Sequence, residues 1–231
     1  MDELPMPRTQ KVSAPKNSRT ELDFFQGWCA VALVALILVI AAGTLLVLHV
    51  MYGVPVGDLT RDALAVAKSP PWYGLLSQIG IFFWAGAATM GLFLWATARG
   101  MGAEQRQASF GLFSALLTIL LGLDDALMMH EKVFPEIFGI PENFVLVSYV
   151  VLLLAFLFFF RGVIIRTDMK LLVFSLFLFG ASMLVDFFLV SAEFLDLIYF
   201  IEDGAKFGGI VAWCGFFFVH TRSLVLRHSS T

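Results

Sequence analysis

The run "FGLFSALLTILLGL" (Phe110–Leu123) leads directly into "DDALMMHEKVF" (Asp124–Phe134). The first part has the composition of a helix that crosses a bilayer. The second part opens with two carboxylates and contains a histidine beside a glutamate. Ionisable groups are costly in hydrocarbon, and those found there usually serve a function. The junction therefore predicts a transmembrane helix that ends in a polar site.

The composition of the whole chain supports this interpretation. Of 231 residues, 59% are hydrophobic and only 14% are charged, and the mean hydropathy is +0.87. A soluble domain would carry roughly a quarter charged residues. The sequence predicts an all-α, polytopic integral membrane protein with six transmembrane helices, at residues 25–50, 73–98, 108–129, 143–165, 171–191 and 204–222.

The two ends of the chain differ in composition from this membrane domain. Residues 1–23 are polar and contain three prolines, which predicts a disordered cytoplasmic tail. Residues 24–226 form the predicted six-helix transmembrane domain, and residues 227–231 form a short cytoplasmic tail. The first apolar run is too long for a signal-peptide core, so an uncleaved span is expected. Small residues in "AGAATMG" (Ala85–Gly91) predict close packing of the second helix on a neighbour.

Basic residues predict the orientation of these helices. Eleven of the fifteen Lys and Arg residues fall on one side of the predicted spans: Arg8, Lys11, Lys16, Arg19, Arg99, Arg106, Arg161, Arg166, Lys170, Arg222 and Arg227. Because such residues concentrate on the cytoplasmic side, both termini are expected in the cytoplasm, with the protein in a bacterial inner (plasma) membrane. Twelve of the eighteen acidic residues lie on the other side. Acidic residues contribute little to orientation, so their asymmetry indicates an extracytoplasmic function.

Three charged residues are expected at one depth in the membrane. Asp124 and Asp186 each lie about 24 Å beyond the inner start of their helix, at 1.5 Å per residue. Lys206 lies about the same distance from the inner end of the last span, counted from Arg222. Helices without strong tilt would place all three groups just beneath the outer boundary, in a single layer.

The spacing of the charges adds partners within each helix. Asp124 and Glu131 are seven residues apart, as are Asp186 and Glu193, which places each pair on one helical face. Glu202 and Lys206 form a further same-face pair, four residues apart. If the third, fifth and sixth helices pack together, they would enclose these groups in one pocket.

His130 does not fit a straight helix in this scheme. It lies about 120° around the helix from Asp124. Either the helix unwinds near Met128 to His130, which Pro135 and Pro141 favour, or His130 faces another neighbour. Asp125 points about 100° away from Asp124 and is a weaker candidate for the site.

Carboxylates with an imidazole are typical of a divalent metal site. The candidate ligands are Asp124, Glu131, Asp186, Glu193 and His130, and the candidate catalytic groups are His130, Glu131 and Lys206. The metal's identity stays open, and "HEKVF" lacks the second histidine of HExxH. A purely structural ion-pair cluster, in which Lys206 neutralises Asp186 or Glu202, is the alternative.

In having Asp and His at the outer ends of its helices, the chain resembles membrane hydrolases of the alkaline-ceramidase type, which hold zinc near one leaflet. The resemblance implies zinc-assisted hydrolysis at the extracytoplasmic leaflet. The chain departs from that family in its six predicted spans, where the family has seven, and in lacking the paired C-terminal histidines. Membership is therefore not inferred.

Three functions are compatible with these features. The first is a metal-dependent enzyme acting on a lipid or small amphiphile. The second is a non-enzymatic subunit or sensor with a structural or cation-binding cluster. The third, an ion or proton transporter, is disfavoured because the span "FVLVSYVVLLLAFLFFF" has no ionisable group that such pathways use. Membrane lipids and a homo-oligomeric or complex partner are expected, and nucleic acid is not.

Overall fold

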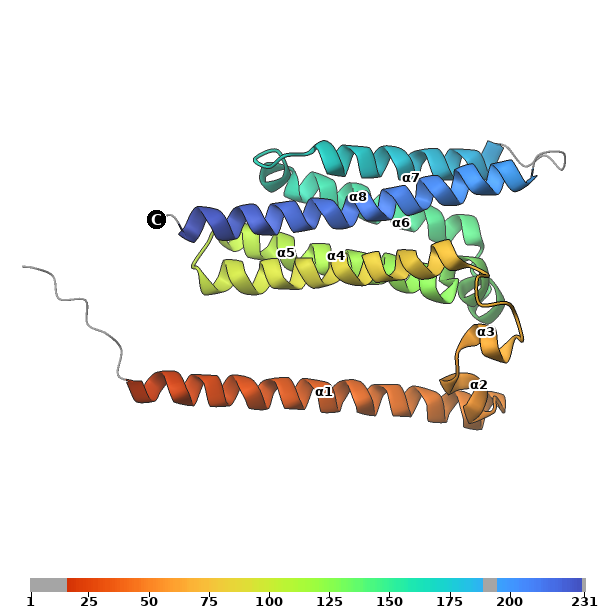
Figure 1. Ribbon diagram of the computed structural model, residues 1–231, viewed down its shortest axis with the longest axis horizontal. Helices are drawn as coiled ribbons and strands as arrows, with labels where there is room; N and C mark the ends of the chain where they lie inside the picture. Colours follow the sequence, from red (N-terminus) through yellow and green to blue (C-terminus); the bar gives the residue numbers. More distant parts are fainter. Residues whose placement is uncertain (1–15, 189–194, 230–231) are drawn as a thin grey trace, which may run out of the picture. The chain divides into compact units, whose positions relative to one another are not determined.

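The computed structural model describes residues 16–188 and 195–229, and within these residues the regular structure is entirely helical. The helices, in chain order, are α1 (Lys16–Tyr52), α2 (Val56–Thr60), α3 (Ala63–Val66), α4 (Leu75–Gly100), α5 (Gln105–Leu127), the π-helix η1 (Met129–Ile137), α6 (Glu142–Ile164), α7 (Lys170–Phe188) and α8 (Leu195–Ser229). The α-helices are labelled in Figure 1. The chain divides into two compact units, residues 1–73 and 74–231. The all-α prediction is confirmed.

Five described helices are long and apolar enough to cross a membrane: 31–52, 75–100, 105–127, 142–164 and 196–227. The sixth expected span, 171–191, coincides with α7 as far as Phe188, and its last residues lie outside the described chain. The start of the first helix differs from expectation. Residues 16–23 were expected in the tail, but α1 already begins at Lys16.

The first unit contains α1 and two short helices. Most apolar side chains of α1 from Val31 onward are exposed within the described part of this unit. Asp62 is the N-cap of α3, and its carboxylate accepts a hydrogen bond from the Ala65 backbone N–H at 3.1 Å.

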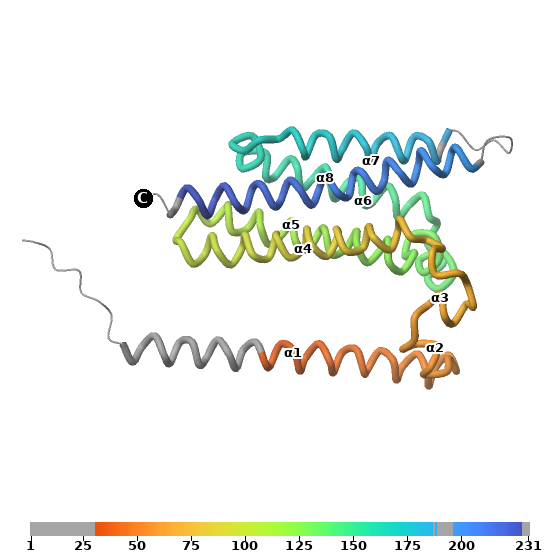
Figure 2. Tube along the Cα trace, in the orientation of Figure 1, coloured from red at the N-terminus to blue at the C-terminus, as the bar shows by residue number. Residues whose placement is uncertain are grey.

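The second unit is a bundle of long helices whose axes are roughly aligned and whose directions alternate along the chain (Figures 1 and 2). α8 packs against both α7 and α4, α4 packs against α5, and α5 also contacts α6. The centre is largely aromatic, with Trp213, Phe216, Phe217 and Phe110 almost fully buried. A buried hydrogen bond from Trp213 Nε1 to Thr118 Oγ1, 3.0 Å long, joins α8 to α5 within this core.

Small residues bring α4 and α5 into close contact, as the "AGAATMG" stretch predicts. A Cβ atom built on Gly91 would lie 2.9 Å from the Ala115 backbone nitrogen, and one on Gly111 would lie 2.6 Å from that of Trp95. Each glycine therefore admits the backbone of the opposite helix. This close approach fixes α5 against α4.

A Schellman motif ends α4 and returns the chain into α5. Gly102 has a φ of 65°, Ala103 N–H donates to the Ala98 carbonyl at 2.9 Å, and Gly102 N–H donates to the Arg99 carbonyl at 3.2 Å. The α4–α5 connection, the α6–α7 connection and the end of α8 share one end of the bundle (Figure 1). This end is called the His220 end below, and the opposite one, with η1, is called the His130 end.

The two ends of the bundle differ in charge. Of nine Lys and Arg residues in the second unit, seven belong to segments at the His220 end: Arg99, Arg106, Arg161, Arg166, Lys170, Arg222 and Arg227. Lys132 and Lys206 belong to segments at the His130 end. The bundle thus gathers at one end the basic residues on which the predicted orientation depends.

Candidate acid–base site at the His130 end

The polar site is created by a break between α5 and η1. Met128 ends α5 in the left-handed conformation, with φ 49° and ψ 47°, which is unusual for a residue other than glycine. The π-helix that follows contains Pro135, which lacks a backbone N–H. This break confirms the first of the two sequence-based alternatives, in which the helix unwinds near Met128 to His130.

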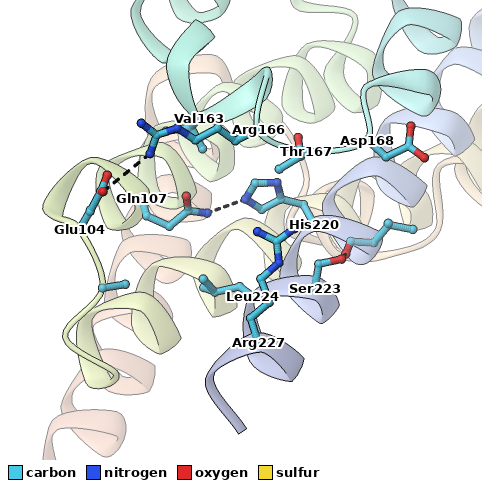
Figure 3. A pocket seen from close by; sticks show the side chains of 12 residues that line it. Glu104, Gln107, Val163, Arg166, Thr167, Asp168, His220, Ser223, Leu224 and Arg227 are labelled. Carbon is cyan, nitrogen blue, oxygen red and sulfur yellow. Dashed lines mark hydrogen bonds and ion pairs between the residues drawn. The ribbon is translucent and has the colours of Figure 1, made fainter. Parts of the chain in front are cut away.

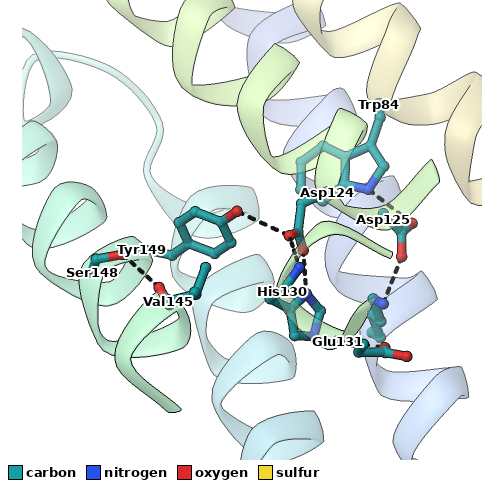
Figure 4. Close-up of polar contacts among 9 residues, drawn as sticks. Trp84, Asp124, Asp125, His130, Glu131, Val145, Ser148 and Tyr149 are labelled. Atoms are coloured by element: carbon teal, nitrogen blue, oxygen red, sulfur yellow. Dashed lines mark hydrogen bonds and ion pairs between the residues drawn. The ribbon is translucent and has the colours of Figure 1, made fainter. Parts of the chain in front are cut away.

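The break turns His130 back onto Asp124, which is buried at the end of α5. The Asp124 Oδ1 atom accepts hydrogen bonds from the His130 backbone N–H and from the Tyr149 hydroxyl, both at 2.9 Å. The Oδ2 atom lies 2.5 Å from His130 Nδ1 (Figure 4). These three residues form the Asp124 cluster, which joins α5, η1 and α6. The contacts satisfy both carboxylate oxygens without a residue from α7.

The Asp124 cluster leaves one nitrogen of His130 available. With Nδ1 held by Asp124, the other ring nitrogen, Nε2, lies 3.6 Å from Glu131 Oε1. The hydrogen bond to Asp124 raises the pKa of His130 above its ordinary value, and the charges of Asp124 and Glu131 add to this, whereas burial opposes it. Glu131 itself is about half exposed, so the imidazole lies between a buried and a solvated carboxylate.

A second charged cluster lies beside the first. Asp125 Oδ1 is 2.6 Å from Lys206 Nζ, and Asp125 Oδ2 accepts a hydrogen bond from Trp84 Nε1 at 3.2 Å. These three residues form the Asp125 cluster, which joins α5 to α4 and α8 (Figure 4). Lys206 is also close enough to act electrostatically on His130. Lys206 was expected to neutralise Asp186 or Glu202, and its ion-pair partner is instead Asp125.

The other predicted residues do not join these clusters. Asp186 is exposed on α7 and forms no hydrogen bond or ion pair with the residues described. Glu202 is half-buried on α8 and lies within electrostatic range of both Asp186 and Glu131. Glu193 lies outside the described residues.

The predicted metal ligands do not form a coordination shell in the described part of the chain. No group of three or more His, Cys, Asp or Glu side chains there is arranged to hold an ion. Asp124 is already engaged by Tyr149 and by two donors of His130, so it would have to exchange these bonds to bind a metal. The described residues therefore give no support to the predicted metal site.

Two members of the clusters were not predicted. Tyr149 lies in the span that was noted above for its lack of a charged group, and Trp84 lies in the middle of an apolar run. The available signal was chemical, because a Tyr O–H or Trp N–H within a membrane helix needs an acceptor. The chain supplies two such acceptors in Asp124 and Asp125.

Comparison with known proteins places the chain in a family. The family described as "Domain of unknown function (DUF8692)" matches residues 28–220, and the chain belongs to it. The match covers α4 to α7 completely and includes both charged clusters. No curated protein and no solved structure matches the chain.

Proposed function

We propose that this member of the DUF8692 family crosses a bacterial inner membrane six times, with both termini in the cytoplasm. The charge difference between the bundle ends supports this orientation, because basic residues favour the cytoplasmic side. In this arrangement α7 is the additional span and the His130 end faces the extracytoplasmic side. Both charged clusters would then lie close to the outer leaflet.

We further propose that His130 is the acid–base group of an enzyme that acts on a lipid or small amphiphile at that leaflet. The observation that carries the proposal is the Asp124–His130 contact of 2.5 Å. A carboxylate on Nδ1 fixes the tautomer and orientation of an imidazole and stabilises its protonated form. Nε2 is then the atom that exchanges a proton with a substrate.

The surroundings of His130 fit a substrate with both polar and apolar parts. Ile137, Phe138 and Phe144 are exposed apolar side chains between the end of η1 and the start of α6, at the same end of the bundle. Lys206 has 39% of its side chain exposed although it is paired to Asp125, so it would contact an anionic part of the substrate. Glu131, whose Oε1 lies 3.6 Å from Nε2, would help to stabilise the protonated imidazole.

The test is turnover by the purified full-length protein in vesicles. Mixed phosphatidylethanolamine and phosphatidylglycerol vesicles, with and without an added ester- or amide-linked amphiphile, are incubated and analysed by mass spectrometry. Wild type should produce a defined product, and His130→Gln should reduce its rate by about 10²–10⁴-fold. Asp124→Asn should reduce the rate similarly, because it misplaces the proton on the ring.

The matched control is Glu136→Gln, which removes an exposed carboxylate of η1 that lies 3.6 Å from Lys132 Nζ. This variant should keep the wild-type rate. The proposal fails if wild type turns over none of these amphiphiles, or if His130→Gln is as active as Glu136→Gln. Metal analysis of the same samples tests whether the enzyme is metal-dependent. In that case wild type should contain a stoichiometric metal ion, and Asp124→Asn should lose it.

A non-enzymatic subunit is the second candidate, and one observation favours it. The polar atoms of Asp124 and Asp125 are satisfied by other residues of the bundle. Such clusters tie helices together, and they need no ligand. This candidate is supported if His130→Gln and Asp124→Asn lower the thermal stability of a wild-type protein that shows no turnover.

A further inference from the structure

The His220 end contains a cavity that is separate from the charged clusters. Its volume is about 320 Å³, and it lies between the start of α5, the α6–α7 connection and the last turns of α8 (Figure 3). Val163, Val219 and Leu224 give it an apolar wall, and Arg166, Arg227 and His220 give it basic groups. This volume lies at the lower end of the range of small-ligand sites.

His220 is the most unusual residue of this cavity. It is buried, with 5% of the residue exposed. Its Nε2 atom lies 2.5 Å from the Gln107 amide nitrogen. Its Nδ1 atom is buried and is the buried side-chain atom left without a hydrogen-bond partner among the described residues.

The contact with Gln107 determines which nitrogen of His220 carries the proton. An amide nitrogen only donates hydrogen bonds, so with Gln107 oriented as in the structure His220 Nε2 must accept. The proton of the neutral ring is then on Nδ1. A buried donor without a partner costs about 1–3 kcal/mol. An acceptor that enters the cavity would recover this energy.

The charged residues of the cavity indicate that this acceptor is an anion. Arg166 is 3.7 Å from Glu104, but both side chains are mostly exposed, and such pairs contribute little and exchange readily. Asp168 is engaged by the Lys170 backbone N–H at 3.1 Å and its ammonium at 3.5 Å. Arg227 is close enough to His220 to act on it electrostatically.

We infer that the cavity binds a phosphate group, from either a phospholipid headgroup or a soluble phosphate ester. The His220 Nδ1–H would donate to one non-bridging oxygen. Arg166 would exchange Glu104 for the phosphate, and Arg227 would add positive charge. Guanidinium groups recognise phosphate well because two N–H bonds can be made at once. The apolar wall would contact the glycerol and first acyl carbons of a lipid.

The test follows His220 directly by ¹⁵N NMR of the full-length protein in detergent with labelled histidine. Four probes are titrated: inorganic phosphate, glycerol 3-phosphate, dioctanoyl phosphatidylglycerol and dioctanoylglycerol. The last has the same acyl chains without phosphate. A phosphate-bearing probe should shift the His220 Nδ1 resonance with saturation, and dioctanoylglycerol should not. Saturation by all three phosphates identifies a soluble phosphate site, and saturation by the lipid alone identifies a headgroup site.

Variants at the His220 end supply a second test of phosphate binding. Arg166→Gln should weaken the binding of the saturating probe by roughly tenfold or more, as expected for loss of a charge-assisted bond. Arg99→Gln is the matched control, because Arg99 lies over the Trp95 ring at the same end but not in the cavity. The inference is wrong if His220 carries its proton on Nε2, if no phosphate probe shifts its resonance, or if Arg166→Gln and Arg99→Gln bind equally.

Discussion

At the scale of residues, two consecutive aspartates have different neighbours. Asp124 faces η1 and α6 and holds His130 and Tyr149, whereas Asp125 faces α4 and α8 and holds Trp84 and Lys206. A step of about 100° between neighbouring residues of a helix is sufficient to separate them in this way. The Asp124 cluster and the Asp125 cluster therefore join different helices, and separate substitutions test their contributions to stability.

The Asp125–Lys206 contact is expected to contribute to stability. Lys206→Met should lower the free energy of unfolding by about 1–3 kcal/mol, because it leaves the buried Asp125 carboxylate unpaired. Asp125→Asn should lower it by less, because the Lys206 side chain is 39% exposed. The double variant should recover much of this loss, since no unpaired charge remains. Thermal unfolding of wild type, the two single variants and the double variant in detergent measures these differences. Additive losses in the double variant would show that the two groups do not interact.

The Asp124–His130 contact predicts a pH dependence of stability. The pKa of folded His130 is raised above 6.5, first by its hydrogen bond to Asp124. The stabilisation is therefore complete below about pH 6.5 and is lost as the pH rises through the folded pKa. Unfolding temperatures between pH 5 and pH 9 should fall with rising pH in wild type. His130→Gln should flatten this dependence, and an unchanged slope would contradict the prediction.

At the scale of elements, the sequence predicts the long helices well and the break between α5 and η1 only as an alternative. Apolar runs of helical length are sufficient to identify α4, α5 and α6 within a few residues. The rotation of α5 about its axis depends on how it packs, which a single sequence does not contain. For this reason the single pocket expected between α5, α7 and α8 does not form. The structure has two clusters instead, one with a residue of α6 and one with a residue of α4, and Asp186 belongs to neither.

The break itself can be tested at Met128. Met128→Gly should raise the free energy of unfolding by about 0.5–1 kcal/mol, because glycine adopts a positive φ without the steric cost of a side chain. Met129→Gly is the control. It lies at the first position of η1, where glycine should destabilise by a similar amount. Equal destabilisation by both changes would contradict a left-handed Met128.

The close contact of α4 and α5 gives a second prediction at this scale. Gly111→Leu should destabilise the protein by at least about 2 kcal/mol, because its Cβ would lie 2.6 Å from the Trp95 nitrogen and the helices would have to separate. Gly162→Ala on α6 has nothing within 4 Å of the added Cβ and should be neutral or slightly stabilising. Chemical or thermal unfolding in detergent distinguishes the two.

At the scale of the whole molecule, the distribution of charge between the bundle ends predicts the topology. In a Cys29→Ala/Cys214→Ala background, Ile165→Cys lies in an exposed position at the His220 end, and Glu136→Cys lies in an exposed position at the His130 end. A membrane-impermeant thiol reagent added to intact cells should label Cys at 136 and not at 165. Labelling of 165 from outside would reverse the proposed orientation.

Adjacent aspartates with partners on opposite sides have a mechanical consequence for α5. Any turn of this helix about its long axis lengthens the link on one side while it crowds the link on the other. The pair therefore restricts rotation of α5 about its own axis. When the bundle changes conformation, α5 is expected to tilt or to shift along its axis rather than to rotate.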